Sequence, residues 1–233
     1  MGLTNSQILD RIQAGLGNRT DKTRAGDLIP WANLAQMRIT RAHYWDELDR
    51  NQPIQVTPSG VPATDKIYTN TTAIRDIQSV RFHEDAYPNQ ARKLTYIPVR
   101  DWDKIIPSGE ELSTGTPTHY TYYADNIEFY RVPDQAWTMQ IRWTLWPAEI
   151  TDDSSYPDLQ EKDDLIIYLA LSYGFHELNM TEEGNRNYAI YRTMLKDAIA
   201  EDVSNRDSNI IPLQIRSNDA PAQDPWTDPF VRS

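Results

Sequence analysis

Hydrophobic and polar residues alternate most clearly between residues 118 and 147. In the last part of this stretch, apolar side chains occupy every second position: Trp137, Met139, Ile141, Trp143 and Leu145. A period of two is typical of a β-strand with one buried face. Two shorter β-prone runs, 119–123 and 127–130, precede it, and turn-forming residues separate the three runs. The stretch therefore predicts an antiparallel meander of three strands, in which Trp146 is an apolar exception on the polar face.

Apolar residues recur at helical spacing near the N-terminus. Thr4 and Gln7 have the spacing of a capping box, in which each side chain bonds a backbone N–H of the other residue. Leu9, Ile12 and Leu16 follow on one helical face. The first expected element is therefore a short amphipathic helix.

A longer helix is expected from Leu28 to Leu48. Pro30 falls in its first turn, where proline is tolerated. His43 lies beside its apolar face, and a lone histidine there is expected to be a hydrogen-bonded structural residue rather than a ligand. Spacings of three and four residues place a set of apolar side chains near that face: Trp31, Leu34, Ala35, Ile39, Ala42, Trp45 and Leu48.

The middle of the chain has short β-prone runs. Proline, threonine, glycine and aspartate dominate residues 51–79, which predicts irregular connections with edge strands. Residues 79–83 and 93–97 alternate like strands. A short helix is expected from Val99 to Ile106, where Pro107 stops it. This part is therefore interpreted as one β-rich unit between two helical ones.

The second helical unit follows the meander. Asp158 and Glu161 are a plausible capping pair, and residues 165–175 are apolar on nearly every side, which is typical of a buried helix. A second helix is expected from Thr181 to Val203 as its antiparallel mate. Its apolar residues recur at helical spacing: Tyr188, Tyr191, Leu195 and Ile199.

Residues 204–233 lack sustained periodicity, and prolines and aspartates interrupt them. We expect an extended arm that lies outside its own domain and docks on a neighbouring subunit. Binding would bury apolar anchors that the arm's polar surroundings cannot cover: Ile211, Leu213, Ile215, Trp226 and Phe230. A frayed terminus is the open alternative.

These elements define an α+β fold, namely a helical bundle with an inserted antiparallel β-rich domain and an extended C-terminal arm. The expected divisions are residues 1–50 for the N-terminal helical part and 51–150 for the β-rich domain. Residues 151–203 form a helical hairpin that completes the bundle, and 204–233 form the arm.

Composition narrows the function classes. The 233 residues carry a formal net charge of -11, which argues against wrapping nucleic acid but suits a surface that DNA passes without sticking. The absence of cysteine excludes disulfides and thiol catalysis. Seven tryptophans and thirteen tyrosines provide large contact surfaces for a core or an interface. No apolar run approaches the roughly 20 residues that span a bilayer, so we expect a protein without membrane contact.

Catalytic patterns are missing from the sequence. The four histidines have no metal-ligand spacing, and the chain lacks a phosphate-binding loop, a dinucleotide fingerprint and a nucleophile elbow. The pairs Asp152–Asp153 and Asp163–Asp164 fall at the edges of an expected helix start, where acids favour the helix dipole. We therefore expect no catalytic residue, no metal, no cofactor and no enzymatic activity.

Several stretches in a fixed order resemble the head-to-tail adaptor proteins of tailed bacteriophages. The order runs from Tyr44-Trp45 through Gly115-Thr116-Pro117-Thr118-His119-Tyr120 to Trp146-Pro147 and an acidic helix start. Members of that group resemble one another in a motif G-x-P-x-x-Y, which this chain keeps. In a second motif, with two prolines, the chain departs, since residues 129–133 contain one proline. The resemblance covers about Pro30 to Val203.

The resemblance implies a ring, commonly of twelve copies, beneath the portal protein at the phage neck. Such a ring joins the portal to tail or nozzle proteins and continues the channel through which DNA leaves. The protein would then be a virion component made in the host cytoplasm. The residues expected to bind partners are these: Tyr188, Tyr191, Leu195, Ile211, Leu213, Ile215, Trp226 and Phe230.

Two other classes stay open. A phage tail component that binds or cleaves glycans would use exposed tyrosine and tryptophan on a sheet, with Glu128 as the one obvious acid on a strand. A monomeric tail chaperone or scaffold would fit the acidic balance and the extended C-terminus.

Overall fold

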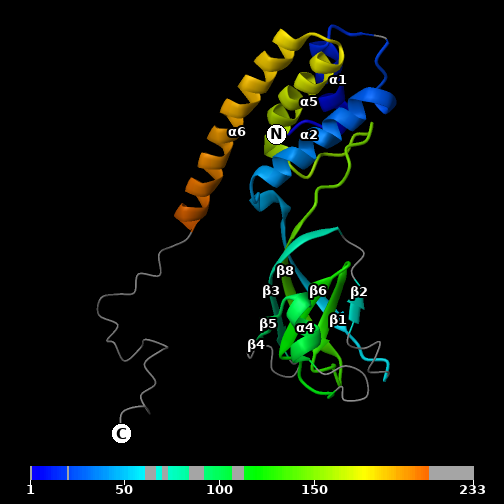
Figure 1. Ribbon diagram of the computed structural model, residues 1–233, viewed down its shortest axis with the longest axis vertical. Coiled ribbons are helices and arrows are strands. Elements are labelled where there is room, and N and C mark those ends of the chain that lie inside the picture. The colour runs from blue at the N-terminus through cyan, green and yellow to red at the C-terminus, as the bar shows by residue number, and fades with distance from the viewer. Residues whose placement is uncertain are drawn as a thin grey trace, which may run out of the picture.

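The computed structural model describes residues 2–19, 21–60, 67–69, 73–83, 92–106 and 113–209. Figure 1 shows an elongated molecule with a helical module at one end and a β-rich module at the other. The helical module contains α1 (Asn5–Gly15), α2 (Ile29–Ala42), α5 (Asp163–Glu177) and α6 (Thr181–Asn209). The chain leaves this module after α2 and returns before α5, so the β-rich module is inserted in it. The mixture of helices and mainly antiparallel strands agrees with the predicted α+β class.

Helix α5 is the centre of the helical module, and α1, α2 and α6 pack against it. Its residues are apolar on nearly every side, and most of them are buried, as the pattern predicted. Gly174 lets two neighbours approach closely, because a Cβ atom there would lie 2.9 Å from the Trp31 ring and 3.1 Å from Leu16. The buried core thus joins residues from both ends of the sequence.

Helix α1 begins as the sequence predicts. The Thr4 hydroxyl accepts a hydrogen bond from the Gln7 amide at 3.3 Å, and the Gln7 side chain accepts one from the Thr4 amide at 3.0 Å. The two bonds satisfy N–H groups that the helix start would otherwise leave unpaired. The predicted capping box is confirmed.

Helix α2 is shorter than the sequence predicts. It ends at Ala42 because His43 has an extended backbone, and a short 3₁₀ turn, Asp46–Leu48, follows. Pro30 lies in the first turn as expected. The prediction of an apolar-face position is wrong for Leu34, which is 56% exposed, and for Ala42, which is also exposed. Neither side chain belongs to the part of α2 that packs into the helical core.

The start of α5 also differs from the prediction. A 3₁₀ turn, Gln160–Lys162, precedes it, and its first residue has no side-chain cap. Asp158 instead accepts a hydrogen bond from the Ala148 amide at 2.8 Å and lies 3.7 Å from the Arg50 guanidinium. Its capping role is therefore wrong, because the chain turns once more before the helix begins.

Helix α6 runs antiparallel to α5 and is longer than predicted (Figure 1). Residues 204–209, expected in the arm, belong to the helix. The helix continues there because the first proline after Thr181 is Pro212. Its inward residues alternate at intervals of three and four, which is the spacing of a helix packed along one seam: Gly184, Tyr188, Tyr191, Leu195, Ala198 and Asp202. Residues 210–233, the rest of the predicted arm, lie outside the described part.

The β-rich module consists of two four-stranded sheets. One has the order β1-β8-β3-β4, formed by Asp49–Val56, Trp137–Leu145, Ile74–His83 and Arg92–Lys93. The other has the order β2-β7-β6-β5, formed by Ile67–Thr69, Asn126–Tyr130, His119–Tyr123 and Thr95–Tyr96. The short helix α4 (Val99–Ile105) lies where a helix was predicted. β1 and β2 are edge strands, as expected for this region.

The predicted meander is only half correct. β6 and β7 form an antiparallel hairpin, but β8 joins the other sheet, between β1 and β3. Alternation along β8 is as predicted, with Trp137, Met139, Ile141 and Trp143 buried between the sheets. With nine residues, β8 matches the long strands β1 and β3 better than the five residues of β7. A periodic pattern identifies a strand but not its partner.

Candidate assembly surfaces

Arg38 of α2 connects three helices at the surface of the helical module. Its guanidinium donates hydrogen bonds to the hydroxyls of Tyr173 on α5, at 3.3 Å, and Tyr188 on α6, at 2.9 Å. It also lies 5.3 Å from the centre of the Tyr188 ring, within the range of a cation–π contact. One long side chain thus holds α6 against the two helices that precede it.

The residues predicted to bind partners fall into two groups. Tyr191 is 2% exposed and belongs to the core of its own chain, where burial raises the pKa of its phenol. Tyr188 and Leu195 are half-buried against the same core. The remaining predicted anchors lie outside the described residues: Ile211, Leu213, Ile215, Trp226 and Phe230. Partner binding by any of these residues stays a prediction.

The outward face of α6 is exposed and charged. It carries both signs, with Arg192 and Lys196 among acidic residues. The acidic residues of this face are Glu182, Glu183, Asp197 and Glu201. The helical module also exposes three apolar side chains, Leu34, Met180 and Val203. This combination of charges and scattered apolar groups is typical of the rim of a protein–protein contact.

Arg75 of β3 forms the connection between the two modules. Its guanidinium donates hydrogen bonds to the backbone carbonyls of Thr40, at 2.6 Å, and His43, at 2.9 Å, just where α2 ends. It also lies over the rings of Tyr44 and Trp146. Sequence reasoning missed Arg75, although Trp146, an aromatic residue on the polar side of its strand, indicated a special environment.

The return of the chain to the helical module is fixed by amides of α2. Asn33 exchanges two hydrogen bonds with the backbone of Ile150, of 3.1 and 2.7 Å, and Gln36 donates one to the Ala148 carbonyl at 2.7 Å. These amides contact backbone on both sides of Glu149. Together with Arg75, they restrict the angle at which the modules meet.

The paired acids have structural partners. Asp152 forms an ion pair with Arg24 at 2.6 Å, and Arg24 also binds Asp10. Asp163 and Asp164 lie in the first turn of α5, as predicted. Arg24 thus links Asp152 to Asp10 of α1, and the other pair of acids lies at the start of α5.

The fold shifts the pKa values of Asp163 and Asp153 in opposite directions. Burial raises the pKa of Asp163, whose carboxylate accepts a hydrogen bond from the Leu3 amide at 2.6 Å. Hydrogen bonds from Ser155 and Thr151, with a smaller contribution from Asn5, lower the pKa of Asp153 to about 2. Asp153 thus organises a loop at the start of α1, rather than the start of α5 for which it was predicted, because the loop folds back on the N-terminus.

Histidines in the described chain have structural surroundings. His43 Nε2 lies 2.6 Å from Asp202 of α6, and its ring contacts Trp45 edge-on, in agreement with the predicted structural role. His119 bonds the Thr118 hydroxyl at 2.8 Å. Among residues whose placement is described, no group of three or more histidine, aspartate or glutamate side chains could hold a metal ion.

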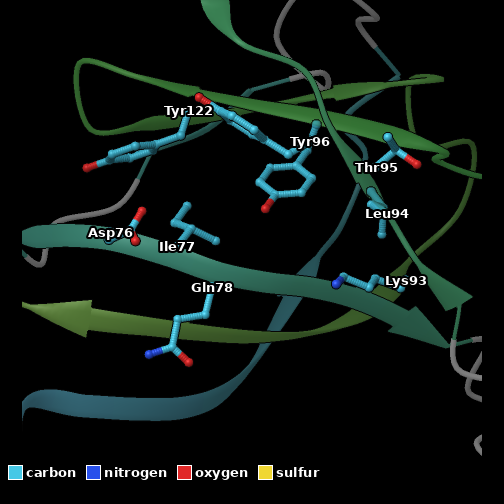
Figure 2. A pocket seen from close by; sticks show the side chains of 9 residues that line it. Asp76, Ile77, Gln78, Lys93, Leu94, Thr95, Tyr96 and Tyr122 are labelled. Atoms are coloured by element: carbon cyan, nitrogen blue, oxygen red, sulfur yellow. The ribbon is translucent and has the colours of Figure 1, made fainter. Parts of the chain in front are cut away.

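A pocket of about 600 Å³ opens between the two sheets. Figure 2 shows the rings of Tyr96 and Tyr122 on one side and Asp76 and Ile77 of β3 on the other. Desolvation by burial raises the pKa of Tyr120 and of Tyr122 from 10 to about 12. Its lining combines tyrosines with polar and apolar side chains: Asp76, Ile77, Gln78, Lys93, Leu94, Thr95, Tyr96, Tyr120 and Tyr122. Sequence reasoning missed this pocket, because its walls come from strands of two different sheets.

The helices of the described part include none with both the length and the apolar content needed to cross a membrane.

Comparison with known proteins places the chain in one family. No curated protein matches it. The family model described as SU10 adaptor protein matches residues 3–217, which include both modules. This match agrees with the resemblance to phage head-to-tail adaptors and extends it to the first helix. The chain therefore belongs to the SU10 adaptor protein family.

Proposed function

We propose that this protein is a structural, non-enzymatic adaptor that forms a ring of twelve copies, the number that the family resemblance implies, between portal and tail. DNA passes through the ring without specific binding, and the negative net charge of -11 supports this, since acidic walls repel phosphate. The protein is made in the host cytoplasm and becomes part of the virion neck.

The observation that carries the proposal is the construction of α6. One face completes the helical module through Tyr188, Tyr191 and Leu195, and the opposite face presents charges of both signs to solvent. In a closed ring, each copy uses two different faces. The outward face of α6 supplies one of them, and the exposed side of α2, with Leu34 and Arg41, supplies the other.

Arg192 and Lys196 are the residues with which this proposal can be tested. Exchanging both for glutamate alters the outward face of α6 but leaves the seam against α5 intact. We expect the variant to remain folded and to lose ring formation, because like charges at a contact are repulsive. Lys104→Glu, an exposed change on α4 in the β-rich module, is the matched control.

The measurement is the mass of the purified protein, alone and with its portal protein, together with electron micrographs of the assemblies. Rings are expected for the wild type and for Lys104→Glu, either spontaneously or on addition of the portal. A wild-type protein that keeps the mass of a single chain in the presence of its portal would contradict the proposed adaptor role.

The arm is the second part of the proposal. We infer that residues after Asn209 dock on a portal or adjacent adaptor subunit, with apolar residues such as Ile211 and Trp226 as anchors. The support is the sequence, in which such residues stand among prolines and aspartates. Repetition around a ring would multiply a modest affinity per arm.

A further inference from the structure

Residues 92–96 cross from one sheet to the other and form one wall of the pocket between them. Arg92 and Lys93 pair with β3 in one sheet, and Thr95 and Tyr96 pair with β6 in the other. Leu94, between them, is buried. The segment therefore closes one side of the space between the sheets and leaves the pocket behind it (Figure 2).

Irregular pairing of β3 shapes the opposite wall. The register of β3 against β8 shifts between Ile74 and Asp76 and again between Ile77 and Ser79. Such bulges redirect side chains from the regular alternation, and they are frequent beside binding sites. As a result, the consecutive residues Asp76, Ile77 and Gln78 all line the pocket.

The pocket offers aromatic surface next to a positive charge. The Tyr96 side chain is 51% exposed, and its ring centre lies 5.4 Å from that of Tyr120. Lys93 lines the pocket, together with Asp76 of the opposite wall. Exposed tyrosine rings of this kind bind proline rings and aromatic side chains of extended peptides. The volume lies in the range that can enclose several side chains.

The chain itself contains a segment with matching chemistry. Residues 224–230 read Asp-Pro-Trp-Thr-Asp-Pro-Phe, two Asp-Pro-aromatic units four residues apart. Between residues 217 and 231 there are three aspartates and no basic residue, so the segment supplies carboxylates that can pair with Lys93. Its prolines limit the conformations that binding must suppress.

The length of the chain permits this contact. Helix α6 points from the helical module toward the end of the molecule at which the β-rich module lies (Figure 1). Residues 210–224 separate Asn209 from Pro225, and these fifteen residues span up to roughly 50 Å when extended. The family match ends at residue 217, before this segment.

We propose that residues 224–230 dock in the inter-sheet pocket of a second copy of this chain. The aromatic side chain of one unit stacks against Tyr96 and Tyr120, and the neighbouring aspartate pairs with Lys93. The inference goes beyond the adaptor role, because it needs neither a portal nor a ring.

The absence of cysteine permits a direct test on the full chain. One cysteine replaces Thr95 at the pocket, and a second replaces Thr227, between the two units. Under mild oxidation we expect a disulfide between chains, seen on a non-reducing gel as a dimer or larger oligomer, and a disulfide within one chain alone would contradict the proposal. The matched control pairs Thr227→Cys with Tyr123→Cys, which lies on the same strand as Tyr120 and Tyr122 but does not line the pocket.

Two further measurements distinguish specific docking from random collision of the two cysteines. Tyr96→Ser, at an exposed position, should slow disulfide formation about tenfold, as for loss of a central aromatic contact. Excess synthetic peptide of residues 218–233 should slow it similarly by competition. Equal rates at Thr95 and Tyr123, or a rate that the peptide leaves unchanged, would overturn the proposal.

Discussion

The guanidinium carbon of Arg75 lies 4.1 Å from the centre of the Tyr44 ring, and this contact joins the β-rich module to the helical module. Tyr44 follows α2 in the chain, whereas Arg75 belongs to β3. The same guanidinium bonds the carbonyls of Thr40 and His43. A cation at the C-terminal end of a helix is also favoured by the helix dipole.

Replacing Arg75 by alanine should therefore weaken the connection between the modules. We expect a loss of about 1–3 kcal/mol in the free energy of unfolding, from charged hydrogen bonds and a cation–π contact. Arg81→Ala, an exposed change on the same strand, should change stability by less than about 0.5 kcal/mol. Denaturant unfolding measures both variants, and equal losses would contradict the assigned role.

The Asp153 carboxylate should make stability depend on acid pH. Its pKa is lowered from 3.8 to about 2 by hydrogen bonds in the folded state. A lowered pKa contributes stability that is present above the unfolded value and disappears as pH falls through the folded value. Wild-type protein should therefore lose more stability than Asp153→Asn between about pH 4 and pH 2.

The measurement is denaturant unfolding at a series of pH values. Asp103→Asn, which removes an exposed charge from α4, controls for the change in net charge. Parallel pH profiles for wild type and Asp153→Asn would show that the loop at the start of α1 does not hold this carboxylate as described.

Gly174 should tolerate a methyl group poorly. In an ordinary helix, Gly→Ala raises stability by about 0.5–1 kcal/mol. Here the added Cβ would lie 2.9 Å from the rigid Trp31 ring, so we expect Gly174→Ala to destabilise by about 1–3 kcal/mol.

Gly15→Ala is the matched control for this change. The atoms nearest to its Cβ would all belong to the flexible Leu171 side chain, which can rotate away, and we expect a smaller effect. Thermal unfolding compares the two variants. A Gly174→Ala protein as stable as the wild type would mean that α2 and α5 can separate without cost.

Truncation should distinguish the helix from the segment after it. A chain that ends at Asn209 keeps all of α6, and we expect its midpoint of thermal unfolding to stay within about 2 °C of wild type. Its occupancy in assembled particles should fall, because the proposed docking anchors are gone.

A chain that ends at Lys196 provides the comparison. It lacks Ala198, Ile199 and Asp202, which pack against the helical module or bond His43, and should unfold at clearly lower temperature. Wild-type occupancy of particles by the chain that ends at Asn209 would rule out the docking arm.

The sequence by itself determined the elements that local patterns control. Alternation identified β8, the Thr4–Gln7 pair identified the start of α1, and the continuous apolar run identified α5 as a buried helix. Each depends on neighbours within one or two turns, which the order of residues contains. Recognition of the adaptor family rested on the same short motifs, and the family match confirms it.

Only the tertiary structure decided which elements meet. The alternating pattern of β8 would bury its apolar face either in a meander beside β7 or between β1 and β3. Because β1 and β3 are longer than β7, they provide more backbone hydrogen bonds to β8. Leu34 is exposed because none of the described helices covers that side of α2, and Arg75 reaches Tyr44 only after β3 is placed beside the helix end. Such contacts join residues distant in sequence, so they depend on packing and leave no periodic pattern along the chain.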